Sequence, residues 1–175
     1  EQLGWLKENG GVVQTVAFSS YVSTEKDKKY KDQLIKNISL LAKEKNINLV
    51  PRNEIRKLKG KSQEDAIATY MELSKVAKNK INLTEFSPVN VSDFVDHIDY
   101  LVKKIGINHV GISSDFDGGG GIEGWNDASE TLNVTIELVK RGYTEKQIAK
   151  LWNGNLLRVL DEVDAIAKKI QAEDI

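Results

Sequence analysis

The sequence contains no cysteine, which excludes disulfides, thiolate metal sites and cysteine nucleophiles. It also lacks any apolar run long enough to span a bilayer, and no signal peptide is visible. Neither sign of charge is in surplus, because 25 Lys and Arg residues face 26 Asp and Glu residues, for a formal net charge of −1. That balance argues against nucleic acid or an anionic membrane as the main partner, since both demand a basic surplus.

What is present is the composition of a globular protein. Of the 175 residues 40% are hydrophobic and 29% are charged, so we expect residues 1–175 to form a single domain. The chain opens with EQLGWLKENGG and has no initiator methionine, which favours a processed or truncated product. No internal repeat stands out.

Two segments have the pattern of buried strands, VVQTVAF (12–18) and NHVGISSDF (108–116). Helices are predicted over residues 1–9, 24–47, 62–80, 92–105, 129–141, 145–152 and 155–170. This order is an α/β alternation, yet two parallel strands close neither a barrel nor a doubly wound sheet. Either further strands lie in 46–51 and 81–86, or the chain is a piece of a larger fold.

The helix boundaries follow from capping patterns. Ser62 with Asp65, and Thr144 with Gln147, have the spacing of capping boxes, and Ser92 is the expected cap of the helix that follows it. Helix stops are expected at Gly10, Gly106 and Gly142. The predicted inward faces consist of Ile67, Tyr70, Met71 and Val76 in one helix, and of Phe94, Val95, Ile98, Leu101, Val102 and Ile105 in another.

The most informative stretch is GISSDFDGGGGIEGWND, in which the second strand ends at Asp115 and Asp117. The carboxyl ends of parallel strands face the ligand crevice of α/β folds. A carboxylate there can act as a general base, bind a metal, or cap the amides of its own turn. The run departs from a calcium loop and from a phosphate-binding loop, because glycines occupy the next ligand positions and no lysine follows. Trp125, which is followed by Asn126 and Asp127, is expected to be exposed.

The remaining candidates are few. His97 lies on an amphipathic helix, where a surface position is expected, and His109 precedes the strand, where a structural role is expected. With two histidines and no cysteine, a zinc site made wholly from this chain is disfavoured. Tyr21 ends the first strand and shares a layer with Asp115 if the strands run parallel. Asn153 or Asn155 is expected to cap the last helix, with Arg158 reaching another element.

Several motifs, in order, resemble the C-terminal part of the membrane (renal) dipeptidase family, the M19 metallopeptidases. They are ENGGVVQTVAFSSY, the helix with DHIDY, VGISSDFDG, GWND, RGY and GNLLRV. The resemblance covers residues 9–21 and 91–163. The region 22–90 looks like a helical insertion between the last two strands of the family's barrel.

The resemblance implies a (β/α)₈ barrel of the TIM type, with two zinc ions at the carboxyl ends of its strands. It implies hydrolysis of dipeptides, including dipeptides with a C-terminal D-residue, by a homodimer. The family's zinc ligands all precede the matched region. We therefore expect this chain alone to bind no zinc and to be inactive, with the N-terminal half of the barrel missing.

Asp115 matches the family's catalytic aspartate, whose implied role is to take a proton from the metal-bridging water and return it to the leaving amine. Tyr21 matches a substrate-binding tyrosine. Asp117 and Gly118 look like loop-shaping neighbours. The competing interpretation is a non-enzymatic binding or assembly module derived from the same barrel, with its sheet edges covered by a partner.

Overall fold

A computed structural model describes residues 1–173 and divides the chain into two compact units. The first, here called the α/β unit, comprises Glu1–Ser23 and Val89–Ile175, and the second, the helical unit, comprises Thr24–Pro88. The limits of the helical unit lie within two residues of the predicted insertion (22–90). Its origin as an insertion between two barrel strands, like the assignment of 1–175 to one domain, stays a prediction.

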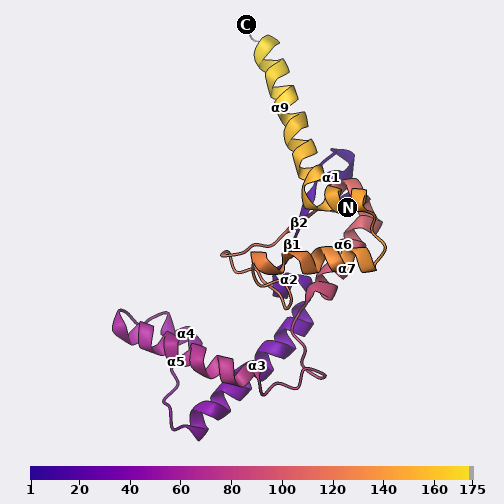
Figure 1. The fold of residues 1–175 in the computed structure, drawn as a ribbon. Helices are drawn as coiled ribbons and strands as arrows, with labels where there is room; N and C mark the ends of the chain where they lie inside the picture. The colour runs from indigo at the N-terminus through magenta and orange to yellow at the C-terminus, as the bar shows by residue number, and fades with distance from the viewer. Residues whose placement is uncertain (174–175) are drawn as a thin grey trace. The chain divides into compact units, whose positions relative to one another are not determined.

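The sheet of the α/β unit consists of two parallel strands, β1 (Val13–Val16) and β2 (Val110–Ser113) (Figure 1). Both lie where the sequence predicts strands, and within the described residues each is paired along one edge. The sequence left open further strands in 46–51 and 81–86, and neither segment is a strand. The described part of the chain is therefore a helix-rich α/β fold with few strands.

Helices surround this strand pair. α1 (Gln2–Glu8) precedes β1, α2 (Ser19–Val22) follows it, and α6 (Val91–Ile105) leads through η1 (Ile107–His109) into β2. The predicted stripe of α6 is confirmed, since Phe94, Val95, Ile98, Leu101 and Ile105 are all buried. Its expected cap is wrong: Asn90, not Ser92, accepts the backbone N–H of Asp93 and forms a capping box with it. Gly106 ends the helix at φ 91°, as predicted.

Beyond the glycine loop lie η2 (Ala128–Glu130), α7 (Thr131–Lys140) and α8 (Glu145–Ala149). The Thr144–Gln147 capping box that starts α8 is confirmed. The break predicted after residue 152 is wrong, because a π-helical turn, η3 (Lys150–Gly154), connects α8 directly to α9 (Asn155–Glu173). Asn155 therefore caps no helix. It is buried and donates hydrogen bonds to the carbonyls of Ile107 (2.7 Å) and Val110 (2.8 Å).

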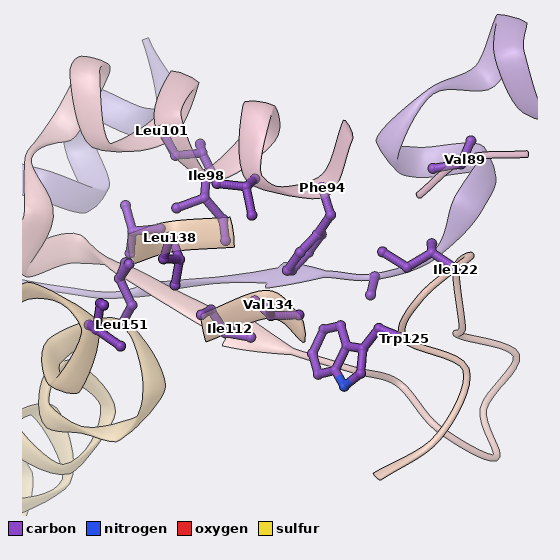
Figure 2. Packing of buried hydrophobic residues seen from close by; sticks show 14 of the residues in the cluster. Val89, Phe94, Ile98, Leu101, Ile112, Ile122, Trp125, Val134, Leu138 and Leu151 are labelled. Atoms are coloured by element: carbon purple, nitrogen blue, oxygen red, sulfur yellow. The ribbon is translucent and has the colours of Figure 1, made fainter. Parts of the chain in front are cut away.

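The main core packs α6, α7 and η3 against the strands (Figure 2). Trp125, for which the sequence suggests exposure, lies in this core and is 2% exposed. Its ring contacts those of Phe94, Phe116 and Trp152 at centroid distances of 5.5, 5.5 and 5.9 Å. The indole N–H donates to Thr131 Oγ1 (3.1 Å), so burial leaves the polar atom of the ring satisfied.

The helical unit contains α3 (Thr24–Glu44), α4 (Arg52–Ile55) and α5 (Lys61–Lys78). Its smaller core consists of Ile38, Leu41, Ala42, Leu73 and Ala77. The predicted inward face of α5 is largely wrong, since Ile67, Met71 and Val76 are exposed while Tyr70 is partly buried. The Ser62–Asp65 capping box is also wrong, because Gly60 precedes α5 and no side chain caps it. No helix of the described residues is long and apolar enough to cross a membrane.

Candidate functional site

The loop that follows β2 begins with a backbone reversal at Asp115. Asp115 has a φ of 54° and Asp117 one of 63°, a left-handed conformation that aspartate tolerates better than most residues. The Asp115 carbonyl accepts hydrogen bonds from the N–H groups of Gly118 (3.1 Å) and Gly120 (2.9 Å). These bonds fold residues 115–120 into a tight turn directly beyond the carboxyl end of the strand.

Two glycines of this loop stand where a side chain would collide. A Cβ added at Gly120 would lie 2.1 Å from the Ser114 carbonyl oxygen, and one added at Gly118 would lie 2.4 Å from Asp115 Oδ1. The Gly118 clash is with a carboxylate that can rotate, whereas the Gly120 clash is with backbone that cannot. The close approach explains why the chain places glycine beside Asp115. The loop-shaping roles of Asp117 and Gly118 stay predictions.

The same loop is attached to the end of β1. Gly121 donates its N–H to the Ala17 carbonyl (3.0 Å) and forms a parallel bridge with Phe18. The Phe18 ring stacks against Tyr21 of α2, with centroids 4.8 Å apart. Because β1 and β2 run parallel, Tyr21 and Asp115 both lie beyond the carboxyl ends of their strands. Tyr21, which was expected at the end of the first strand, lies on α2 instead, after β1 has ended at Val16.

Both candidate side chains are open to solvent. Asp115 is exposed, and among residues 1–173 its carboxylate accepts no hydrogen bond. Tyr21 is 71% exposed, and its ring contact with Phe18 leaves the phenol hydroxyl accessible. Of the roles that the sequence left open for the Asp115 carboxylate, the capping of turn amides is performed by the backbone carbonyl of the same residue. The carboxylate is therefore available for chemistry.

The far end of the loop is attached to α6 and α7. Glu123 exchanges backbone hydrogen bonds with Val89 (2.9 Å) and Val91 (3.1 Å), next to the start of α6. The Gly124 carbonyl accepts a bond from the Asn133 side chain on α7 (2.8 Å). With Trp125 inserted into the core and the Phe116 ring packed against it, the loop is held at both ends, while the side chains of Asp115 and Asp117 are exposed.

Residues of two sequence motifs form an ion-pair network that the sequence pattern did not predict. Arg141, from RGY, donates to Asp96 and to Asp99 (2.7 Å), both from DHIDY, and to Glu137 (3.0 Å). It also donates to the carbonyl (2.8 Å) and hydroxyl (2.9 Å) of Ser92. Burial lowers the pKa of Arg141, but the hydrogen bonds that its guanidinium donates to these carboxylates outweigh this effect, and the net pKa is raised.

The neighbouring Tyr143 completes this network. Its hydroxyl donates to Asp99 (2.6 Å), and burial together with this acceptor raises the pKa of the phenol. The signal in the sequence was the pair of aspartates three residues apart on α6, opposite an Arg-Gly-Tyr turn. The network joins α6 to the end of α7, so it positions the helices that carry the loop anchors.

The two histidines are not brought together. His109 Nδ1 lies 2.8 Å from the Gly11 carbonyl, and Arg158 donates to the Gly10 carbonyl (2.8 Å) and the Asn108 carbonyl (3.2 Å). These bonds tie the start of β1 to the start of β2, at the end opposite Asp115, and give both residues the structural roles that were expected. His97 is half-buried on α6. In the described chain no group of three or more His, Cys, Asp or Glu side chains could hold a metal ion.

The family model of the membrane dipeptidases (peptidase family M19) matches residues 1–174. The chain belongs to this family. The resemblance seen in its motifs is thereby confirmed.

Two curated relatives and one protein of known structure carry the name dipeptidase. Dipeptidase ataJ of Aspergillus terreus is 38% identical over 97 residues, 55% of this chain and 24% of that protein. Dipeptidase aclJ of Aspergillus oryzae is 32% identical over 122 residues, 69% of this chain and 27% of that protein. The crystal structure of the probable dipeptidase PvdM from Pseudomonas aeruginosa has a TM-score of 0.55 and 36% identity, covering 90% of this chain and 38% of that one. The chain thus spans well under half the length of these relatives.

Proposed function

We propose that this chain is the C-terminal part of a zinc-dependent dipeptidase, and that it forms one wall of that enzyme's active site. The proposal is supported by family membership together with one observation: the unpaired Asp115 carboxylate follows β2 at the sheet edge where Tyr21 follows β1. In barrels built from parallel strands, catalytic side chains lie at this edge. The assignment of the two strands to the end of a (β/α)₈ barrel belongs to the same proposal.

Asp115 is proposed as the proton shuttle. Its carboxylate takes a proton from the water that attacks the peptide carbonyl, and returns that proton to the amine nitrogen as the C–N bond breaks. An exposed carboxylate without a competing hydrogen bond is suited to both transfers, because neither protonation state has to break an internal contact. Tyr21 is proposed to contact the bound dipeptide through its hydroxyl, and Asp117 and Gly118 to shape the loop.

Among the described residues no three or more His, Cys, Asp or Glu side chains are grouped so that they could hold a metal ion, which supports this part of the proposal. We therefore place the zinc ligands in residues outside this chain, in an N-terminal part of the protein. In consequence the chain alone is expected to be inactive. Cleavage of dipeptides with a C-terminal D-residue and a homodimeric full-length enzyme remain parts of the proposal.

The test uses a longer form of the protein that includes the upstream residues its relatives have. Asp115→Asn is expected to lower kcat on L-L and L-D dipeptides by roughly 10²–10⁴-fold, the usual contribution of a general acid–base group. Asp117→Asn is the matched control, because asparagine also tolerates a positive φ, and it should retain activity within about tenfold. Zinc content, measured by mass spectrometry, should be the same in all three proteins.

Equal loss of activity in both variants, or full activity in Asp115→Asn, would show that Asp115 is not the shuttle. Dipeptide hydrolysis by the 175-residue chain itself, abolished by Asp115→Asn, would contradict the placement of the metal-binding half outside it.

A second candidate is a non-enzymatic binding or assembly module. It is favoured by the single-edge pairing of both strands and by an apolar stripe that α9 exposes, formed by Leu156, Leu157, Leu160, Val163, Ile166 and Ile170. Figure 1 shows α9 extending away from the strand pair. A coding sequence that starts directly before Glu1 would favour this module, whereas an upstream His-x-Asp motif after a strand favours the enzyme. The module also predicts self-association in light scattering.

A further inference from the structure

The helical unit concentrates positive charge. Residues 24–88 contain fifteen Lys and Arg against nine Asp and Glu, a formal charge of +6 in a chain whose net charge is −1. Its fold is two long helices, α3 and α5, with the segment 45–55 beside them. Nothing in the proposed dipeptidase chemistry uses this unit.

A cavity of about 450 Å³ opens in this unit. Its apolar wall comes from α3 and from the segment that follows it, and consists of Ile35, Ile38, Ala42, Ile47, Leu49 and Val50. Sites that bind small molecules have volumes of roughly 300–1,000 Å³ and mostly apolar linings with a few polar groups. The size and lining of this cavity fit that class.

Two cations line the same cavity, and no Asp or Glu does. Lys43 and Arg52 are exposed and form no ion pair within residues 1–173, and the Arg52 guanidinium lies over the Tyr70 ring, 5.9 Å from its centroid. Two adjoining hollows share Arg52 and Tyr70 with the cavity. These hollows are lined by four further cations, Lys31, Lys75, Lys78 and Arg56. No Asp or Glu lines the cavity or either hollow. Lys43 and Arg52 thus lie in the cavity and four further cations line the adjoining hollows, of which Lys31 is paired with Asp27 (2.6 Å).

We propose that this cavity binds a single-chain amphiphile with an anionic head, a free fatty acid. The aliphatic chain would lie on the apolar wall and its carboxylate between Lys43 and Arg52. A cation that lacks an internal partner gains most from a carboxylate, because the charge-assisted hydrogen bond replaces water alone. The cavity is partly open, and its volume of about 450 Å³ is that of a small-molecule site, which suits one alkyl chain better than the flat surface of a membrane.

The test uses the 175-residue chain and dodecanoate below its micellar concentration, followed by isothermal titration calorimetry. Dodecanoate is expected to bind saturably at one site, and dodecyltrimethylammonium is expected not to bind. The double variant Lys43→Gln, Arg52→Gln should weaken dodecanoate by about tenfold or more, which corresponds to 1.4 kcal/mol. It should leave binding of uncharged dodecanol within twofold. Lys36→Gln with Lys45→Gln is the matched control, since both lysines are exposed in the same unit and line none of the three hollows.

A second pair of variants tests the apolar wall. Ile35→Asp should abolish binding of both dodecanoate and dodecanol, because Ile35 lines the cavity. Leu40→Asp on the same helix should leave binding unchanged, since Leu40 is equally exposed, at 49%, but lies outside the cavity. Circular dichroism of each variant verifies that the helices remain.

Several outcomes overturn the proposal. The first is absent or non-saturable binding of dodecanoate, and the second is equal affinity for dodecyltrimethylammonium. The third is an equal loss of dodecanoate affinity in the Lys43→Gln, Arg52→Gln variant and in the Lys36→Gln, Lys45→Gln control. Binding that disappears as the chain self-associates would assign the cavity to a second copy. Binding that the longer protein lacks would assign it to upstream residues of the same polypeptide.

Discussion

The two units of this chain are opposite in charge and differ in how they are held together. The α/β unit has ten Lys and Arg against seventeen Asp and Glu, a formal charge of −7, beside +6 in the helical unit. Among residues 1–173 its core cluster has fifteen buried apolar residues, whereas that of the helical unit has five. The even composition of the whole sequence therefore conceals two units with different surfaces.

Their polar contacts differ in the same way. In the α/β unit the informative bonds join residues far apart in sequence, as between Arg141 and Asp99 or between Asn155 and Val110. In the helical unit the ion pairs are mostly between neighbouring turns of one helix, such as the exposed pair of Lys29 with Glu25. Pairs of that kind contribute about 0.3–0.5 kcal/mol each. The α/β unit is thus specified by tertiary contacts, and the helical unit chiefly by helix periodicity.

The largest effect that tests this comparison is expected from Trp125→Ala. Removing the indole leaves a void between Phe94, Phe116 and Trp152 and an unpaired Thr131 hydroxyl, so the free energy of unfolding should fall by about 3–5 kcal/mol. Urea denaturation followed by circular dichroism measures it. Trp5→Ala, at a site 57% exposed, is the control and should change stability by less than about 0.5 kcal/mol.

Leu73→Ala probes the core of the helical unit in the same way. Leu73 is 2% exposed, and its truncation should cost that unit about 2–4 kcal/mol. All three tryptophans lie in the α/β unit, so their fluorescence reports on that unit, while far-ultraviolet circular dichroism reports on both. In Leu73→Ala we expect the part of the circular dichroism transition that comes from the helical unit to move to lower denaturant concentration. The midpoint of the fluorescence transition, which reports on the α/β unit, should not change. A common shift of both signals would show that the chain unfolds as one cooperative body.

Asn155→Ala tests whether a single buried amide couples the π-helical turn to the strands. Its loss leaves the Ile107 and Val110 carbonyls without this donor, which should cost about 1–3 kcal/mol. Asn153→Ala, two residues earlier and exposed, should be within about 0.5 kcal/mol of the unchanged chain. Equal effects at both positions would mean that helix propensity, not the tertiary contact, decides the energy.

The smallest expected effect concerns alkaline pH. The folded state raises the pKa of Tyr143, through burial and then through the hydrogen bond to Asp99, so it binds the phenol proton more tightly than the unfolded state does. This contribution is fully present below the ordinary tyrosine pKa of about 10 and is lost as the pH rises above it. In the unchanged chain this contribution to the free energy of unfolding should be present at pH 8 and fall above pH 10. In Tyr143→Phe that part of the fall should be absent, which unfolding curves at the two pH values measure. Tyr100→Phe, at an exposed site, is the control and should show the same fall as the unchanged chain.

Some local features could be predicted, although the caps at Ser62 and Ser92 could not. The stripe of α6, the capping box of Thr144 and the stop at Gly106 depend on spacing within one or two helical turns, where periodicity and backbone conformation decide. The position of Asp115 and Tyr21 beyond the ends of two parallel strands also followed from strand pattern. The motifs identified the M19 family, because their order along the chain is specific even where single motifs are not.

Other features depended on partners distant in sequence. Trp125 lies between glycine and Asn-Asp, a polar context, and is buried because Phe94 and Trp152 complete a ring cluster around it. Met71 fits a helical stripe, yet it is exposed because α5 rotates to bury Leu73 and Ala77 against α3. A stripe fixes which residues share a face, and only the packed neighbour selects the face that is buried.

The sequence by itself determined the family, the helical segments, the two strands and the placement of Asp115 and Tyr21 beyond them, since these follow from local periodicity and ordered motifs. The tertiary structure alone decided that Arg141, Asp96, Asp99 and Tyr143 form one network, and that Lys43 and Arg52 line an apolar cavity of the helical unit. The reason is physical: charge and hydrogen-bond partners forty or more residues apart meet only once the chain has folded.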